Sequence, residues 1–165
     1  MTFRKAVIED LPELCSVFNH ITDNLSSRGI YIWDEVYPNC IFPEDINEGR
    51  MYILENENGI VSAFALLDSD KDKDSVQWEK QNAKSCYLYR MGIIPEYYGK
   101  GIGAYMLGEA AKLSKEKGAE YLRLFVADCN PPAIRFYEKN GYKTAEGAFQ
   151  KPGLDFLLLG YEIKL

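Results

Sequence analysis

The sequence of 165 residues has one histidine, four cysteines and no long uninterrupted apolar run. The cysteines (Cys15, Cys40, Cys86 and Cys129) form no Cys-x-x-Cys pair and no cysteine–histidine spacing, which argues against structural zinc and a disulfide scaffold. No stretch reaches the roughly 18 apolar residues of a membrane span, and the first residues lack the apolar run of a signal peptide. We therefore expect a cytoplasmic protein with free thiols, no metal and no membrane partner.

Positive charge is also scarce, because 19 lysines and arginines stand against 25 aspartates and glutamates, for a net charge of −6. No basic patch is present to neutralise phosphates, so nucleic acid is excluded as a partner. The acidic balance is compatible with a cationic partner such as an amine, although many enzymes are equally acidic. With 47% hydrophobic residues and no linker or repeat, we expect a single domain over residues 1–165.

Hydrophobic periodicity predicts alternating strands and helices, in an order that indicates an α/β domain with a mixed sheet. Asn58-Gly59 is a strong hairpin signal, because both residues of such a turn need positive φ. Asp10 and Asn130 are expected to cap the helices that follow them. The expected strands are Phe3–Val7, Met51–Glu55, Ile60–Leu67, Cys86–Ile94, Tyr121–Ala127, Tyr142–Phe149 and Leu154–Lys164. The expected helices run from Glu9 to about Leu25, from Pro43, from about Gly101 to Lys117, and from Pro131 to about Asn140.

The most informative segment is Gly99-Lys100-Gly101-Ile102-Gly103, between a predicted strand and a predicted helix. A pyrophosphate needs several donors converging from one side, and the free N–H groups of a helix's first turn supply them. Glycines remove the side chains that would keep the backbone away from phosphate oxygens, and Lys100 adds positive charge at the rim. An ordinary glycine-rich turn is the alternative. A Walker loop is excluded because GxxxxGK[ST] is absent, and the dinucleotide fingerprint is only weakly matched.

Two motifs carry a resemblance to a known family. Pro95 and Tyr98-Gly99-Lys100-Gly101-Ile102-Gly103, followed by a helix, resemble motif A of the GNAT superfamily of N-acetyltransferases, although Tyr98 stands where the family usually has Gln or Arg. The segment Leu124–Tyr142, with Tyr137-Glu138-Lys139-Asn140-Gly141-Tyr142, resembles motif B. Two motifs in this order, about thirty residues apart, are far more specific than either alone.

The resemblance implies a GNAT-like (acyl-CoA N-acyltransferase) fold, with a mixed central sheet of about seven strands flanked by about four helices. It implies an acyltransferase that moves the acetyl group of acetyl-CoA to a primary amine of a small molecule or peptide by direct attack, and family members often form homodimers. A splayed pair of strands, Cys86–Ile94 and Tyr121–Ala127, would hold the pantetheine arm, with the thioester carbonyl near backbone N–H groups. The residues that would contact acetyl-CoA are Met91, Ile93, Tyr98, Gly99, Lys100, Gly101, Ile102, Gly103, Asn130 and Ala133.

Tyr137 is the catalytic candidate, because a phenol near the departing sulfur could stabilise or protonate it. Helical spacing alone favours a core aromatic that packs on Ile134 and Ala133, so the catalytic role rests on the resemblance. For Asn130, a helix cap and a contact with the pantetheine arm both stay open. Cys129 lacks a base partner and receives no covalent role.

The acceptor amine would meet the irregular segment after the first helix, where Trp33, Asp34, Glu35 and Tyr37 lie. The aromatic side chains could line a pocket and the carboxylates attract a cation, but an aromatic cluster that closes the sheet is an equal alternative. The general base and the acceptor stay open. A non-catalytic CoA-binding sensor or interaction module is the alternative function.

Two arginines, an acidic segment and the single histidine lie outside these motifs. Arg90 and Arg123 are expected on sheet faces near the mouth of the cleft. The segment Asp68-x-Asp70-x-Asp72 imitates the start of a calcium loop, but Lys73 stands where that loop requires glycine, so we expect a solvated connection. His20 is expected to be a surface or packing residue.

Overall fold

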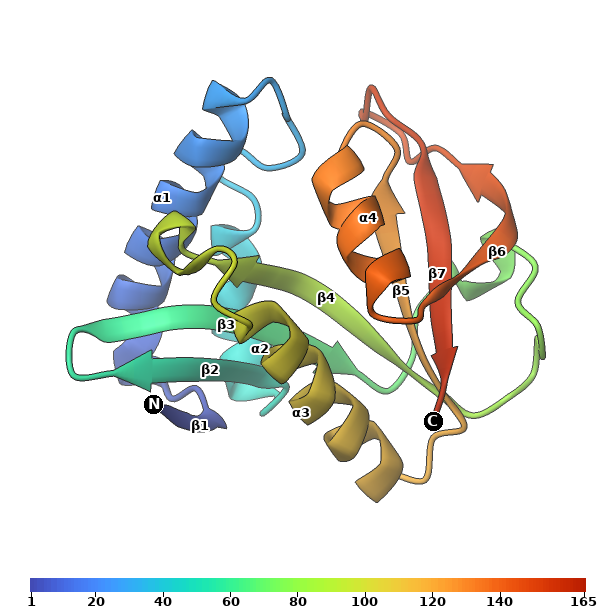
Figure 1. The fold of residues 1–165 in the computed structure, drawn as a ribbon, viewed down its shortest axis with the longest axis horizontal. Helices are drawn as coiled ribbons and strands as arrows, with labels where there is room; N and C mark the ends of the chain where they lie inside the picture. The colour runs from blue at the N-terminus through green and yellow to red at the C-terminus, as the bar shows by residue number, and fades with distance from the viewer. The chain divides into compact units, whose positions relative to one another are not determined.

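The computed structural model describes residues 1–165, which fold into two compact units (Figure 1). The first unit consists of Met1–Leu66 and Arg90–Leu107, and the second of Leu67–Tyr89 and Gly108–Leu165. Strand β4 (Ser85–Ile93) and helix α3 (Ile102–Glu116) each contribute to both units. That a single domain spans the chain stays a prediction.

The seven strands are hydrogen-bonded in the order β1-β2-β3-β4-β5-β7-β6. β4 pairs with β5 in parallel, whereas β1–β2, β2–β3, β5–β7 and β6–β7 are antiparallel, so the expected mixed sheet is confirmed. The other strands are β1 (Thr2–Lys5), β2 (Met51–Asn56), β3 (Gly59–Leu67), β5 (Tyr121–Ala127), β6 (Lys143–Phe149) and β7 (Leu158–Lys164). The other helices are α1 (Leu11–Ser27), α2 (Phe42–Asn47) and α4 (Pro131–Lys139), which gives the four helices expected. None of the helices is both long and apolar enough to cross a membrane.

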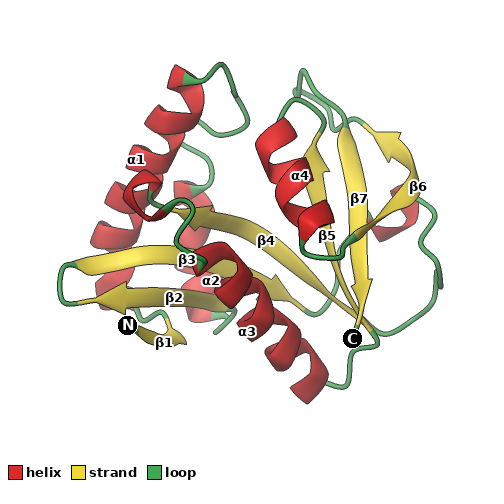
Figure 2. Cartoon of the chain, viewed as in Figure 1, coloured by secondary structure: helices red, strands yellow, loops and turns green.

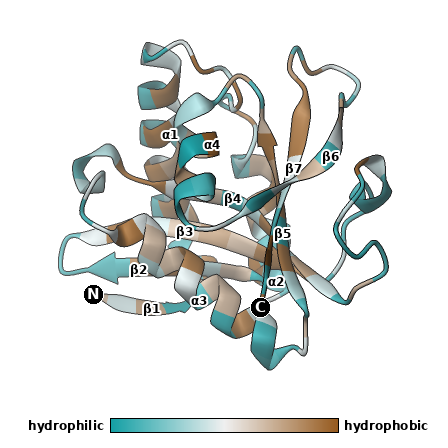
Figure 3. Ribbon diagram, turned by 45° about the vertical axis from the view of Figure 1, so that its right-hand side comes forward, coloured by the Kyte–Doolittle hydropathy of each residue, from teal (hydrophilic) through white to brown (hydrophobic).

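Helix α1 of the first unit is amphipathic, with apolar side chains at helical spacing and polar residues between them (Figure 3). Leu14, Phe18 and Ile21 are buried on its inner face. The ring of Phe18 packs edge-on against Phe42 of α2, with ring centroids 4.8 Å apart. Figure 1 shows α1 behind the strands of this unit and the first turns of α3 in front of them. The Tyr105 ring of α3 packs edge-on against the Phe3 ring of β1. The strands are therefore covered on both faces within the first unit.

Strands β2 and β3 form the predicted hairpin, but its turn differs in detail. The turn residues are Glu57 and Asn58, and the side-chain oxygen of Asn56 accepts the Asn58 N–H at 2.7 Å. Gly59 has φ 115°, whereas Asn58 has no positive φ. The expectation that both residues of Asn58-Gly59 take positive φ was therefore wrong for Asn58.

One predicted helix cap and one predicted strand boundary also differ from the structure. The Asp10 carboxylate accepts from Arg4 Nη1 at 2.7 Å and from the Val7 N–H at 2.8 Å, and it makes no capping hydrogen bond to α1. The last strand begins at Leu158 rather than Leu154 because a turn closes first, in which Gly153 has φ 84°.

The second unit is built on β5, β7 and β6 with the first half of β4. Its core contains Val76, Trp78, Tyr87 and Ala145. Because a Cβ at Gly160 would lie only 2.9 Å from Trp78 and from Val76, a glycine in β7 lets the β3–β4 connection pack onto the sheet. This connection is a long loop that only a short 3₁₀ helix interrupts (Figure 2).

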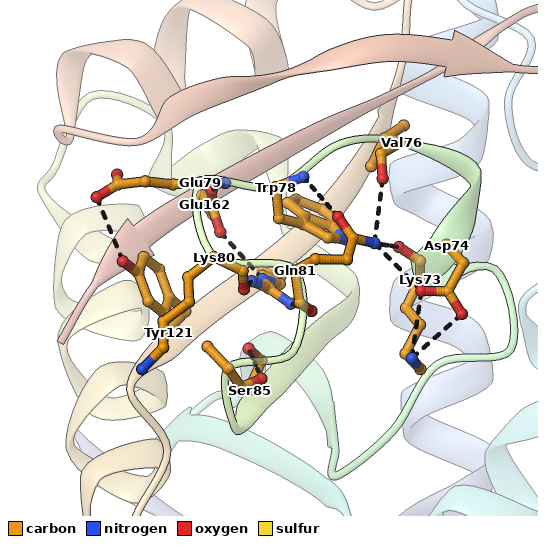
Figure 4. Close-up of polar contacts among 12 residues, drawn as sticks. Lys73, Asp74, Val76, Trp78, Glu79, Lys80, Gln81, Ser85, Tyr121 and Glu162 are labelled. Atoms are coloured by element: carbon orange, nitrogen blue, oxygen red, sulfur yellow. Dashed lines mark hydrogen bonds and ion pairs between the residues drawn. The ribbon is translucent and has the colours of Figure 1, made fainter.

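Arg123 of β5 anchors that loop. Its Nε donates to Glu162 Oε2 at 3.0 Å, its Nη2 donates to the Lys80 carbonyl at 2.7 Å, and its guanidinium stacks 4.7 Å from the Trp78 ring centroid. The other Glu162 oxygen accepts the Glu79 N–H at 2.6 Å. Figure 4 shows Glu162 and Tyr121 of the sheet beside the loop residue Glu79.

Arg123 is fully buried and structural, so the expectation of an arginine at the mouth of a cleft was wrong. The connection is largely exposed, as expected, but Val76 and Trp78 are buried.

Candidate active site

The glycine-rich segment forms an open turn between β4 and α3. A short 3₁₀ helix, Pro95–Tyr97, precedes it, and α3 begins at Ile102. Gly99 and Gly101 have φ of 73° and 79°, which side-chain-bearing residues rarely adopt. A Cβ at either position would meet no atom within 4 Å. Backbone conformation, rather than crowding inside the protein, thus requires glycine here, and the space beside the turn is open.

The first backbone N–H groups of α3 are available to a ligand. At the start of this helix, the Tyr105 N–H donates to the Gly101 carbonyl at 3.1 Å. The structure records no intramolecular acceptor for the N–H groups of Gly99, Gly101, Ile102, Gly103 and Ala104. Unpaired donors at the positive end of a helix dipole form a natural site for phosphate.

Two side chains border this turn. The Lys100 ammonium lies 4.7 Å from the centroid of the Tyr97 ring, at the exposed rim where we expected a positive charge. The Tyr98 side chain is 42% exposed, and partial burial raises the pKa of its hydroxyl. Tyr98 therefore offers a neutral phenol where the family usually has Gln or Arg.

The carboxyl end of β4 holds the two residues predicted beside the thioester, Met91 and Ile93, both half-buried. Gly92 between them is closely packed, since a Cβ there would lie 2.9 Å from Ile21 and 3.0 Å from Phe18 of α1. The Gly92 carbonyl accepts from the Ser62 hydroxyl at 2.8 Å. Packing and hydrogen bonding thus fix the backbone of this short segment.

Arg90, just before this segment, has an unusual backbone. It is the only non-glycine residue with positive φ, at 50°, a conformation that costs about 1–2 kcal/mol for such a residue. Its Nη2 lies 2.6 Å from Asp45 Oδ2, and the two side chains are 6% and 0% exposed. Sequence reasoning missed both residues' roles, because nothing in the local pattern marks Arg90 as left-handed or Asp45 as buried.

The parallel pairing of β4 and β5 is short. It runs from Ser85–Tyr121 to Leu88–Leu124 and stops there, although both strands continue. The next residues, Tyr89 and Phe125, pack against the aromatic core of the second unit. The pairing therefore ends within the stretch where the resemblance implies that the two strands separate.

Helix α4 begins as predicted, with Asn130 at its N-cap. The side-chain oxygen of Asn130 accepts the Ala133 N–H at 3.3 Å, and Asn130 is buried. The capping prediction is confirmed. A contact of Asn130 or Ala133 with pantetheine stays a prediction.

Tyr137 lies in the last turns of α4 and is half-buried. Its ring contacts those of Phe136 and Tyr142, with centroids 5.3 Å and 5.7 Å away. Packing of the ring on Ile134 and Ala133 stays a prediction. The Tyr137 hydroxyl makes no hydrogen bond in the structure. Desolvation raises the pKa of this hydroxyl well above its ordinary value, so Tyr137 keeps its proton.

The predicted acceptor segment is a loop ordered by its own contacts. Asp34 Oδ1 accepts the Tyr37 and Val36 N–H groups at 2.7 Å and 2.8 Å, and these bonds lower the pKa of the carboxyl. The Trp33 ring packs on Phe18, with centroids 5.3 Å apart, whereas Glu35 and Tyr37 are exposed. Asp34 thus shapes the loop, and Glu35 presents its carboxylate to solvent.

The remaining candidates have ordinary partners. His20 Nε2 lies 2.9 Å from Glu96 Oε1 on the surface. Asp70 accepts from the Tyr89 hydroxyl and from the Asp72 N–H, so the calcium-like segment is held by its own hydrogen bonds. No group of three or more His, Cys, Asp or Glu residues is arranged to hold a metal ion. Cys129 is exposed, and the pKa of its thiol is raised, mainly by desolvation.

The chain is similar to known acetyltransferases. A model of the Acetyltransferase (GNAT) family matches residues 16–142. The spermidine N(1)-acetyltransferase of Thermoplasma acidophilum is 38% identical over 157 residues, which cover 94% of this chain and 93% of that protein.

Solved structures show the same fold. A GNAT-family acetyltransferase from Streptococcus agalactiae is 17% identical, with a TM-score of 0.80 over 99% of this chain and 95% of that chain. The PaiA N-acetyltransferase of Thermoplasma acidophilum, solved in complex with coenzyme A, is 25% identical, with a TM-score of 0.69 over 99% of this chain and 98% of that chain. Since the family model covers most of the chain and both motifs lie within the matched residues, the chain belongs to the GNAT family of acetyltransferases.

Proposed function

We propose that the protein transfers the acetyl group of acetyl-CoA to a primary amine by direct attack of the amine. The observation that carries this proposal is the set of unpaired N–H groups at Gly99 and at residues 101–104, with two left-handed glycines and open space beside those glycines. CoA contains a pyrophosphate, which such a set of donors fits. The coenzyme A complex of the Thermoplasma neighbour supports the same ligand.

The residues fall into three proposed groups around acetyl-CoA. Gly99, Lys100, Gly101, Ile102 and Gly103 would hold its phosphates, with Tyr98 beside them. The N–H groups of Met91 and Ile93 would face the thioester carbonyl. Asn130 and Ala133 would contact the pantetheine arm.

In the proposed reaction, the neutral amine gives its lone pair to the carbonyl carbon and a C–N bond forms. The C–S bond breaks, and its electron pair leaves on sulfur. The N–H groups of Met91 and Ile93 would stabilise the charge that develops on the carbonyl oxygen. Tyr137 would donate its hydroxyl proton to sulfur, and the surplus proton of the amine, passed through water, would restore that hydroxyl.

A polyamine is the acceptor class that we propose first. Spermidine is the substrate named for the Thermoplasma relative. The chain's net charge of −6 and the exposed Glu35 favour a cationic acceptor. Trp33 and Tyr37 would line the acceptor site, and Asp34 would hold its loop in shape. A cytoplasmic location, a homodimer and the lack of a nucleic-acid partner belong to the same proposal.

The test is an assay of the purified protein with acetyl-CoA and a panel of amines: spermidine, free lysine, an aminoglycoside and a peptide with a free N-terminus. Cys40 and Cys129 are exposed and would react with thiol reagents. Products are therefore measured as acetylated amine by mass spectrometry and as CoA by chromatography.

The expected result is CoA release that depends on spermidine or another cationic amine, with one acetyl group added per CoA. Binding of acetyl-CoA without acetylation of any amine would instead support a CoA-binding sensor. An absence of binding would overturn the proposal.

A further inference from the structure

The backbone of Arg90 requires an explanation that its sequence neighbours do not supply. It lies inside β4, and its φ of 50° is the only positive value at a non-glycine residue. A residue in this conformation kinks a strand and turns the next peptide unit away from the regular ladder. Such an outlier persists only when its surroundings hold it in place.

Asp45 of α2 is the group that holds it. Arg90 Nε and Nη2 donate to Asp45 Oδ2 at 2.7 Å and 2.6 Å. The other carboxylate oxygen, Oδ1, accepts from Arg50 Nε at 2.7 Å. Asp45 is fully buried, so a carboxylate fixed from two sides ties the left-handed residue to α2.

Stability alone is a weak reason for this arrangement. Removing a carboxylate and a guanidinium from water costs much of what their attraction returns, and well-packed apolar residues often stabilise a core equally well. Arg50 continues outward to Glu44, with Nη2 and Oε1 2.6 Å apart, so the network is charge-balanced. What the ion pair adds is a defined direction for the chain at residue 90.

The segment that follows Arg90 is the one proposed to face the thioester carbonyl. Its far end is fixed by the Ile94 N–H, which donates to the Val61 carbonyl at 3.0 Å. Its middle is fixed by Ser62, whose hydroxyl donates to the Gly92 carbonyl. Arg90 supplies the remaining fixed point, directly before Met91.

We propose that Asp45 and Arg90 are positioning residues, whose buried ion pair aims the backbone N–H groups of Met91 and Ile93 at the thioester carbonyl of acetyl-CoA. The inference rests on the proposed function. Neither side chain touches the reacting atoms. Preorganised donors stabilise charge on a carbonyl oxygen only when their direction is fixed.

The experiment uses acetyl-CoA carrying ¹³C at the carbonyl, bound to the full chain in the absence of any acceptor. A hydrogen-bonded, polarised carbonyl moves its ¹³C resonance downfield relative to free acetyl-CoA. The native protein is expected to show this shift, and Asp45→Asn, which keeps the side chain's size, is expected to lose most of it at unchanged affinity for acetyl-CoA. Glu44→Gln is the matched control, because it removes the carboxylate that pairs with Arg50 but leaves the Asp45–Arg90 pair.

Arg90→Gly is a second variant, which tests the inference even if Asp45→Asn does not fold. Glycine takes φ of 50° without strain, so this variant releases the tie to Asp45 and keeps the backbone conformation accessible. It is expected to lose the downfield shift as well. With an accepted amine, Asp45→Asn and Arg90→Gly should lower kcat about 100-fold while KM for the amine changes little.

A native-like ¹³C shift in both variants, or no downfield shift in the native protein, would overturn the inference. A bound resonance would still be present in those cases. The lack of any bound resonance would contradict the proposed function itself, so the two failures are distinguishable.

Discussion

A Cβ placed on Gly92 would lie 2.9 Å from Cδ1 of Ile21, so strand β4 and helix α1 approach too closely for a side chain at this position. Ile21 and Phe18, which also contacts this position, are both buried. The contact links α1 to the segment proposed to face the thioester.

Gly92→Ala should therefore destabilise the protein, because the added methyl group displaces buried side chains in a packed core. We expect a loss of about 1–3 kcal/mol in the free energy of unfolding, measured by urea denaturation. Gly108→Ala is the control, since Gly108 lies in α3, where an added Cβ would meet nothing within 4 Å, and this variant should gain stability. Equal stabilities of Gly92→Ala and the native chain would contradict the close packing.

Glu162→Gln should destabilise the second unit, because the buried Arg123 guanidinium loses its carboxylate partner. Breaking a buried pair typically costs about 3 kcal/mol or more. Hydrogen exchange should quicken at the Glu79 N–H, which donates to Glu162.

Glu120→Gln is the control for that change. Glu120 pairs with Lys80 on the surface of the same unit, where solvent screens the ion pair, so this variant should lose far less stability than Glu162→Gln. Similar losses of stability in the two variants would show that Arg123 does not depend on Glu162.

Acid should weaken the Arg4–Asp10 pair in a predictable pH range. Hydrogen bonding with Arg4, Nη1 to Oδ2 at 2.7 Å, lowers the pKa of Asp10 below its ordinary 3.8. A depressed pKa stabilises the folded state above the unfolded pKa, and this contribution disappears as the pH falls through the folded pKa. Asp10→Asn should cost about 1 kcal/mol at pH 7, measured by urea denaturation, and less below pH 4. If the difference in unfolding free energy between Asp10→Asn and the native chain stayed constant over this pH range, the lowered pKa of Asp10 would be contradicted.

Tyr137→Phe should lower kcat about 100-fold and leave the affinity for acetyl-CoA nearly unchanged, because only the proton donor is lost. Since desolvation raises the pKa of Tyr137 above its ordinary 10.0, the native enzyme should keep this donor protonated up to and beyond that pH. The measurement is kcat from pH 6 to 10 for both proteins with an accepted amine. Full activity of the variant would make Tyr137 a packing residue beside Phe136 and Tyr142.

Local sequence signals predicted the parts of the site that depend on nearby residues. The glycines at 99 and 101 indicated the open turn, and Asn130 followed by Pro131 indicated the start of α4. In each case, the conformation depends on residues within a few positions. The hairpin after β2 was found for the same reason.

The missed features depend on partners far away in the sequence. Arg90 meets Asp45, and Arg123 meets Glu162, across 45 and 39 residues respectively. The left-handed conformation of Arg90 has no local signal, since arginine is not a residue that favours it. Asp10 was expected to cap α1, but Arg4 offered its carboxylate a stronger, charged partner.

The most direct test of the central claim is calorimetric titration of acetyl-CoA into the native chain, Gly101→Leu and Gly108→Leu. Leucine at residue 101 conflicts with φ of 79° and fills the space beside the unpaired N–H groups, whereas residue 108 has ordinary helical geometry in the same helix. We predict that the native chain and Gly108→Leu bind acetyl-CoA equally well and that Gly101→Leu binds at least about 10-fold more weakly. Equal binding by all three proteins would contradict a phosphate site at this turn, and no binding by the native chain would contradict acetyl-CoA as the substrate.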